Sequence, residues 1–176
     1  MATTNTMSRI QGLYAITDSG LLQSKLLPAV AAALQGGAQI IQYRDKIAIG
    51  LSADANQREQ QRRHDEATAL LALCRQHHIP LLINDDVALA QAIGADGVHL
   101  GQGDGSLFAA RARLGANAII GVTCHDRLDF AKIAARDGAS YVAFGAMFAS
   151  DTKPLAQSCP LSTLTEARAQ LPLPLV

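Results

Sequence analysis

The sequence predicts an α/β protein built from repeated strand–helix units with parallel strands. Short aliphatic runs alternate with stretches of helical periodicity, as in 81–104, where an apolar run, a helical stretch and a second apolar run follow one another. The composition is 49% hydrophobic but only 4% aromatic, which suits the aliphatic strands of a buried parallel sheet. Parallel strands joined by right-handed crossovers form an open layered sheet or a closed barrel, and the pattern alone leaves both open.

Six strand–helix units can be assigned in chain order. The expected strands are 13–16, 38–43, 81–83, 98–100, 118–122 and 141–144. The expected helices are 26–34, 62–77, a stretch between the third and fourth strands, 107–114, 126–137 and 161–171. Pro28 suits a first helical turn, and Gly36 with Gly37 suits the helix stop that precedes the second strand.

Two segments lie outside this repeat. Residues 47–61 are polar without clear periodicity, so we expect an exposed, mobile loop over the mouth of the fold. Residues 173–176 resemble a seventh strand that has barely begun. A closed barrel of this type needs eight strands and typically about 250 residues, so the chain is expected to be truncated after six units.

Length, charge and cysteine content bound the class of protein. The 176 residues fit one domain, expected at 10–176 after a disordered tail at 1–9. The formal net charge of +0 argues against nucleic acid or an anionic membrane as the main partner. No apolar run approaches the length of a membrane span, and three cysteines without a C-x-x-C pair indicate reduced thiols in the cytoplasm.

Polar side chains follow every strand from the second onward. Carboxyl ends of parallel strands meet at one edge of the sheet, where α/β enzymes place their chemistry. The residues concerned are Gln42, Arg44 and Lys46, then Asn84 and Asp85, then His99, Gln102 and Asp104, then Thr123 and His125, and finally Ser150, Thr152 and Lys153. Two cations at alternate positions suit a diphosphate, and two carboxylates suit Mg²⁺. Taken singly, Asp85 could equally cap the next helix and Asp104 could lie in a turn.

These residues resemble the thiamine-phosphate synthase family, also called thiamine-phosphate pyrophosphorylase. The resemblance runs from Leu13 to the end of the chain, and its most specific segment is 94–104. Its motifs are Gln42-x-Arg44-x-Lys46, Ile83-Asn84-Asp85, Gly94-Ala-Asp-Gly-Val-His-Leu-Gly-Gln-x-Asp104, Gly121-Val-Thr-x-His125 and Thr152-Lys153-Pro154. Membership implies a (β/α)₈ TIM barrel and a transferase that condenses hydroxymethylpyrimidine diphosphate with thiazole phosphate into thiamine phosphate and diphosphate.

The resemblance also implies a role for each site residue. Gln42, Arg44, Lys46 and Asn84 would bind the pyrimidine diphosphate, and Asp85 with Asp104 would bind the Mg²⁺ cofactor. Thr123 stands where the family often has a serine that contacts the diphosphate, and Ser150 with Thr152 would meet the thiazole phosphate. Arg44, Lys46 and Lys153 would stabilise the leaving diphosphate. Small molecules are the expected partners, together with a possible homo-oligomer.

Other functions stay open from the sequence alone. A thiazole tautomerase on the same barrel would not need the whole set of cations and carboxylates. A non-catalytic phosphate-ligand-binding fragment would be compatible with the expected truncation. A zinc hydrolase using His99, His125, Asp85 and Asp104 lacks the usual ligand spacing. The thiol of Cys124 is expected to be buried and without a chemical role.

Overall fold

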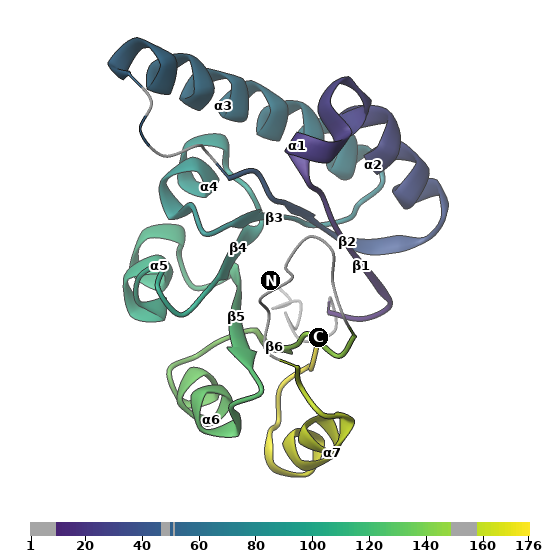
Figure 1. Ribbon diagram of the computed structural model, residues 1–176, viewed down its shortest axis with the longest axis vertical. Coiled ribbons are helices and arrows are strands. Elements are labelled where there is room, and N and C mark those ends of the chain that lie inside the picture. The colour runs from purple at the N-terminus through teal and green to yellow at the C-terminus, as the bar shows by residue number, and fades with distance from the viewer. Residues whose placement is uncertain (1–9, 47–49, 51, 149–157) are drawn as a thin grey trace, which may run out of the picture. The chain divides into compact units, whose positions relative to one another are not determined.

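The computed structural model describes residues 10–46, 50, 52–148 and 158–176, and the segments predicted as a tail at 1–9 and as the Ser150–Lys153 cluster lie outside this description. Strands and helices alternate along the chain (Figure 1). The strands are β1 (Leu13–Ile16), β2 (Ala38–Tyr43), β3 (Leu81–Asn84), β4 (Gly97–Leu100), β5 (Ile119–His125) and β6 (Tyr141–Phe144). They follow one another in a sheet in chain order, which confirms an α/β fold of successive strand–helix units.

The helices also follow the predicted repeat. They are α1 (Ser19–Leu22), the 3₁₀ helix η2 (Gln23–Lys25), α2 (Leu26–Gln35), α3 (Ala53–Gln76), α4 (Val87–Ile93), α5 (Leu107–Leu114), α6 (Leu128–Arg136) and α7 (Leu161–Gln170). Helix α2 ends directly before Gly36, as predicted, and Gly37 adopts a left-handed φ of 93° on the way into β2. The two short helices α1 and η2 were not predicted.

The prediction of an irregular loop over 47–61 is wrong for its second half. Helix α3 begins at Ala53, nine residues before the expected start at Arg62. The Ser52 hydroxyl caps the helix by accepting from the Ala55 amide, and Asp54 complements the positive end of the helix dipole. The low hydrophobicity of this segment therefore marks an exposed helix stabilised by its own polar pairs.

The chain forms two compact units, Gln11–Val98 and a second unit that comprises His99–Val176 together with Ile10. In the N-terminal unit, β1, β2 and β3 pair in parallel, with Ile16 opposite Gln42 and Tyr43 opposite Ile83. Helices α2, α3 and α4 lie on one side of these strands (Figure 1). The aliphatic runs of β2 and β3 are almost fully buried, which is the pattern of parallel strands covered on both faces.

In the C-terminal unit, β5 pairs in parallel with β6. Buried residues of β5, β6, α6 and α7 form one hydrophobic cluster, which includes Cys124, Ala131, Val142, Phe144 and Ala167. The predicted seventh strand appears only as a single parallel bridge between Leu175 and Val142, supported by the hydrogen bond from the Val176 amide to the Val142 carbonyl at 3.0 Å.

Arg111 binds the two turns that precede β5 and β6 in the C-terminal unit. The guanidinium of Arg111 in α5 donates to the carbonyls of Gly115 and Ala116, both at 3.2 Å, and to Ala118, which directly precedes β5. Its other terminal nitrogen donates to the Gly138 carbonyl at 3.0 Å, in the turn that leads to β6. The side chain therefore joins two connections that enter neighbouring strands.

Candidate active site

The end of β2 carries the cations expected to bind phosphate. Gln42 is buried, and its amide donates to the Tyr14 hydroxyl at 2.7 Å. The Arg44 guanidinium lies 3.0 Å from the Asp18 carboxylate, and the Arg44 amide donates to the Thr17 hydroxyl at 3.0 Å. These contacts fix the direction in which the chain leaves β2.

Tyr14, Thr17 and Asp18 belong to this site and were missed as site residues in the sequence. A signal was present, because Thr17 and Asp18 directly follow the first strand, just as the predicted site residues follow the later ones. Asp18 also caps α1 by accepting from the Leu21 amide at 3.2 Å. One carboxylate therefore shapes the turn after β1 and orients the cation that follows β2.

Lys46, Asn84 and Asp85 come together where β2 and β3 end. The Lys46 ammonium lies 4.0 Å from the Oδ2 atom of Asp85, and the Asn84 side chain donates to the same oxygen at 2.5 Å. Asp85 adopts a left-handed φ of 64°, a conformation that Asp and Asn tolerate better than most residues. The strand pairing therefore places a cation, an amide and a carboxylate side by side.

The C-terminal unit holds the second set of predicted residues. The Asp104 carboxylate accepts from the Gly101 amide at 2.9 Å, and a Cβ on residue 101 would lie only 2.5 Å from that carboxylate oxygen. Gly101 therefore makes room for Asp104 to fold back over the end of β4. Gln102 donates to the Thr123 carbonyl, which ties this turn to β5.

His99 supports Thr123 from inside the unit. Its Nε2 atom lies 2.7 Å from the Thr123 hydroxyl, and its Nδ1 atom lies 2.8 Å from the Tyr141 hydroxyl. The imidazole and the Tyr141 ring are stacked with centroids 5.6 Å apart. Both ring nitrogens are engaged in a buried position, so His99 orients Thr123, and a zinc-ligand role would require breaking these bonds.

The donor atoms fit a hard cation better than zinc. Among the residues that the structure describes, no three His, Cys, Asp or Glu side chains gather as a metal site. Mg²⁺ needs fewer protein ligands, because one or two carboxylates suffice when water and substrate phosphate complete the shell. Asp85 and Asp104 both carry carboxylate oxygens of this kind.

Burial keeps the thiols of two of the three cysteines protonated. All three are free and buried. Burial raises the pKa of Cys124 to about 12 and that of Cys74 to about 11, so both stay protonated at neutral pH. The expectation that Cys124 is an inert buried thiol agrees with this environment.

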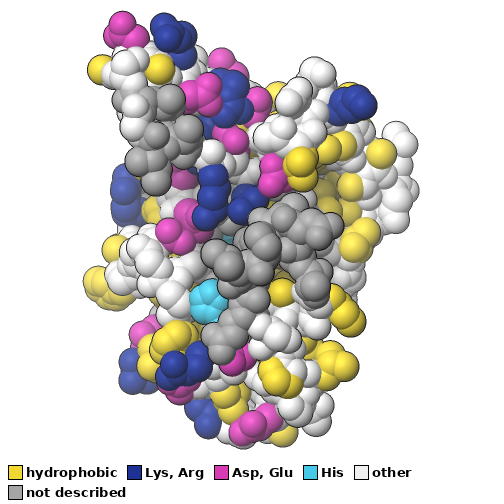
Figure 2. All heavy atoms as spheres, viewed as in Figure 1, with side chains coloured by type: hydrophobic (Ala, Val, Ile, Leu, Met, Phe, Trp, Pro, Cys, Tyr) yellow, Lys and Arg dark blue, Asp and Glu magenta, His cyan; other side chains and the backbone are white. Residues whose placement is uncertain are grey.

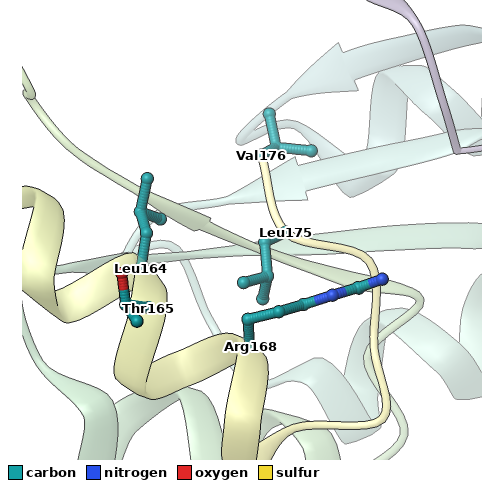
Figure 3. Close-up of a pocket in the computed structure, with 5 residues that line it drawn as sticks. All are labelled: Leu164, Thr165, Arg168, Leu175 and Val176. Atoms are coloured by element: carbon teal, nitrogen blue, oxygen red, sulfur yellow. The ribbon is translucent and has the colours of Figure 1, made fainter.

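A cavity of ≈ 490 Å³ in the C-terminal unit is lined by five residues, none of which is a predicted site residue. They are Leu164, Thr165, Arg168, Leu175 and Val176 (Figure 3). Leu164 and Leu175 flank the space between α7 and the C-terminal segment, and Arg168 extends beneath Leu175. The five lining residues include no Asp or Glu side chain.

The side-chain chemistry of the surface is mixed. On the face shown in Figure 2, Lys and Arg side chains are interspersed with Asp and Glu and form no broad field of one sign. Within the described part of the chain, none of the helices combines the length and apolar character needed to cross a bilayer.

Cations, amides and carboxylates at the carboxyl ends of parallel strands define the class of α/β enzymes that bind their ligands at this edge. The chain belongs to the thiamine monophosphate synthase family, whose sequence model matches residues 13–176. It is accordingly a transferase.

Individual relatives agree with this assignment. The chain is 52% identical over 161 residues to a thiamine-phosphate synthase from Chromobacterium violaceum, an alignment that covers 92% of this chain and 73% of the relative. A solved thiamine phosphate pyrophosphorylase from Pyrococcus furiosus superposes with a TM-score of 0.76 at 29% identity, over 97% of this chain and 74% of the other. A tryptophan synthase from Mycobacterium tuberculosis, at 12% identity and a TM-score of 0.59, over 98% of this chain and 76% of the other, shares the fold alone.

Proposed function

We propose that this chain condenses 4-amino-2-methyl-5-hydroxymethylpyrimidine diphosphate with thiazole phosphate, in a Mg²⁺-dependent reaction that yields thiamine phosphate and diphosphate. The observation that carries the proposal is the cluster where β2 and β3 end, with the Lys46 ammonium 4.0 Å from the Asp85 carboxylate and Asn84 bonded to the same oxygen. A cation and a carboxylate at one place suit a substrate that arrives as a metal-bound diphosphate. The relatives named above carry the names of this activity.

The reaction needs stabilisation of a leaving group and no protein nucleophile. Breaking the C–O bond at the pyrimidine methylene places negative charge on the departing diphosphate, while the aminopyrimidine delocalises the positive charge. In this proposal Arg44, Lys46 and Lys153 stabilise the departing diphosphate. Asp85 and Asp104 would hold Mg²⁺, which neutralises diphosphate charge when it is bound.

Substrate binding is assigned to polar side chains around these groups. Gln42 and Asn84 would bind the pyrimidine diphosphate. The Thr123 hydroxyl, oriented by His99, would donate a hydrogen bond to the diphosphate. Ser150 and Thr152 would meet the thiazole phosphate. The thiazole nitrogen, held beside the cation by its own phosphate, then forms the new C–N bond, which is catalysis by proximity.

The direct test is to incubate the 176-residue chain with both substrates and MgCl₂ and to measure thiamine phosphate by mass spectrometry. Asp85→Asn keeps a residue that tolerates the left-handed backbone, so it removes only the charge. We expect it to lower kcat/KM by at least about 100-fold, the typical effect of losing one charge-stabilising group. Asp137→Asn, which removes a surface carboxylate paired with Arg136, is the matched control.

Two results would contradict the proposal. Absence of thiamine phosphate with the wild-type chain at saturating substrates would exclude the activity. Equal turnover of Asp85→Asn and wild type would remove Asp85 from the site.

Lys153→Ala should lower kcat more than it raises KM, because the leaving diphosphate gains charge only in the transition state.

A further inference from the structure

The segment that leaves β2 presents its side chains in two directions. Lys46, with 65% of its side chain exposed, reaches towards Asp85, whereas the Asp45 side chain is only 8% exposed. Tyr43 lies on the same side as Asp45, since its hydroxyl is 3.4 Å from Asp45 and donates to Glu66 of α3 at 2.8 Å. This is the alternation of an extended chain, in which neighbours face opposite ways. Asp45 therefore faces α3, behind the candidate site.

Arg63 of α3 lies between two carboxylates in this region. Its side chain is 11% exposed, its Nη1 atom is 2.9 Å from Asp86, and its Nε atom is 3.7 Å from Asp45. The second oxygen of Asp86 accepts from the Leu89 amide at 2.9 Å and caps α4. One guanidinium thus connects the segment after β2 with the first turn after β3.

The two carboxylates are the chain neighbours of two candidate site residues. Asp45 precedes Lys46, and Asp86 follows Asp85. Any displacement of Asp86 moves Asp85, whose left-handed backbone leaves little freedom to compensate. Lys46 therefore contacts Asp85 directly, and their chain neighbours Asp45 and Asp86 are connected through Arg63 on the side that faces α3.

We propose that Arg63 is a positioning residue, which sets the spacing between Lys46 and Asp85 and so the affinity of the site for a diphosphate with its magnesium ion. The inference rests on the proposed function, since it assigns Arg63 to the site that binds the diphosphate. Arg63 donates one hydrogen bond, from Nη1 to Asp86, and its contact with Asp45 at 3.7 Å is an ion pair. A planar guanidinium suits this task better than a flexible ammonium, because the angle between its nitrogens is fixed. Arg63 itself touches no substrate in this scheme.

Arg62 provides a matched control on the same helix. Its guanidinium also contacts Asp45, at 2.6 Å, but its other partners are Glu59 and Glu66 of α3. The Arg62 side chain is 36% exposed, more than three times the fraction of Arg63. Replacing Arg62 removes the shorter of the two arginine contacts to Asp45 but keeps the contact of Arg63 to Asp86, so it separates loss of an Asp45 partner from loss of the connection to Asp86.

The test measures binding of inorganic diphosphate in MgCl₂ by isothermal titration calorimetry, with thermal melts to report the folded fraction. Arg63→Met is expected to weaken diphosphate binding about 10- to 100-fold, the range found for partners that orient ligating groups. Arg62→Met should stay within about threefold of wild type. Arg63→Lys keeps the charge but cannot reach both carboxylates with the same geometry, so its affinity should fall between Arg63→Met and wild type.

The outcomes separate the two proposals. If Arg63→Met and Arg62→Met weaken binding equally at equal folded fraction, the positioning role is wrong and the proposed function stands. If Arg63→Met does not fold, Arg63→Lys decides, and wild-type affinity in that variant would overturn the positioning role. A wild-type chain that binds no diphosphate would overturn the proposed function and the positioning role with it.

Discussion

Tyr141 occupies space that only a glycine at position 121 leaves available. A Cβ on Gly121 would overlap the Tyr141 ring, whose hydroxyl is bonded to His99. Gly121→Ala is therefore expected to destabilise the chain by about 1–3 kcal/mol, the cost of overpacking a core. It should also disturb the His99 contact to Thr123. Guanidinium chloride unfolding followed by circular dichroism measures the change.

Gly103→Ala is the control for this substitution. A Cβ at Gly103 meets nothing within 4 Å, so the free energy of unfolding should change by less than about 0.5 kcal/mol. Equal stability of the two variants would show that Tyr141 does not pack against Gly121 in solution.

The candidate site was predictable at this scale only in part. Arg44, Lys46, Asn84 and Asp85 could be singled out as candidate site residues because they lie at the carboxyl ends of buried strands, where α/β enzymes place their binding groups. Their partners did not follow. Tyr14 meets Gln42 only through the pairing of β1 with β2, at a separation of 28 residues that no local pattern encodes.

Helix α3 shows how an exposed polar helix escapes a search for apolar periodicity. Its buried apolar residues, Ala67, Leu70, Leu71 and Cys74, all lie in the second half, so only that half carries the pattern. The first half is stabilised by pairs one turn apart, such as Gln61 with Asp65 at 2.8 Å and Glu59 with Arg62 at 2.7 Å. The hydrogen bond from Arg62 lowers the pKa of Glu59. Such pairs resemble a charged loop when only composition is considered.

Gln61→Pro tests whether this first half is helical in solution. Proline removes an amide donor and clashes with the preceding turn, so we expect a loss of about 3 kcal/mol in the free energy of unfolding. In an irregular loop the same change would cost little. Thermal unfolding measures the difference, with a lower Tm expected.

Gln61→Ala controls for loss of the Gln61 side chain and its bond to Asp65. It should cost no more than about 0.5 kcal/mol, since pairs of this kind contribute little on an exposed helix. A proline variant as stable as the alanine variant would restore the loop interpretation for this stretch.

Across the whole molecule, the order of strands and helices was predictable because each apolar run is short and bounded by Gly or polar residues. The ends of β1, β2, β6 and α5 agree with the predicted bounds. Helices α1 and η2 escaped prediction because they are set by the Asp18 cap and the turn after β1, with too few residues for a periodic pattern. Closure into an eight-stranded barrel stays a prediction.

Alkaline pH should weaken both units through their buried thiols. Burial raises the pKa of Cys74 to about 11 and that of Cys124 to about 12, against about 8.5 for a thiol in an unfolded chain. Above pH 8.5 the unfolded state therefore binds fewer protons than the folded state, so stability falls as pH rises. The loss approaches about 1.4 kcal/mol per pH unit for each thiol.

Guanidinium chloride melts between pH 8 and pH 10 measure this slope. The double variant Cys74→Ala, Cys124→Ala should be less stable at pH 8, because it leaves small cavities, but its stability should depend less on pH. Parallel slopes for the variant and wild type would assign the alkaline loss to other groups. Tyr43, whose pKa is also raised by burial, titrates at higher pH and contributes little in this window.

The bonds that Arg111 makes to four backbone carbonyls have a consequence for engineering. They secure the turns that enter β5 and β6, whereas the residues assigned to chemistry follow the strands at their opposite ends. A redesigned enzyme could therefore exchange loops around Thr123 for new substrate specificities while the anchorage of the scaffold stays intact. Libraries of variants should change the loops that follow the strands of this unit and keep the turns that precede β5 and β6.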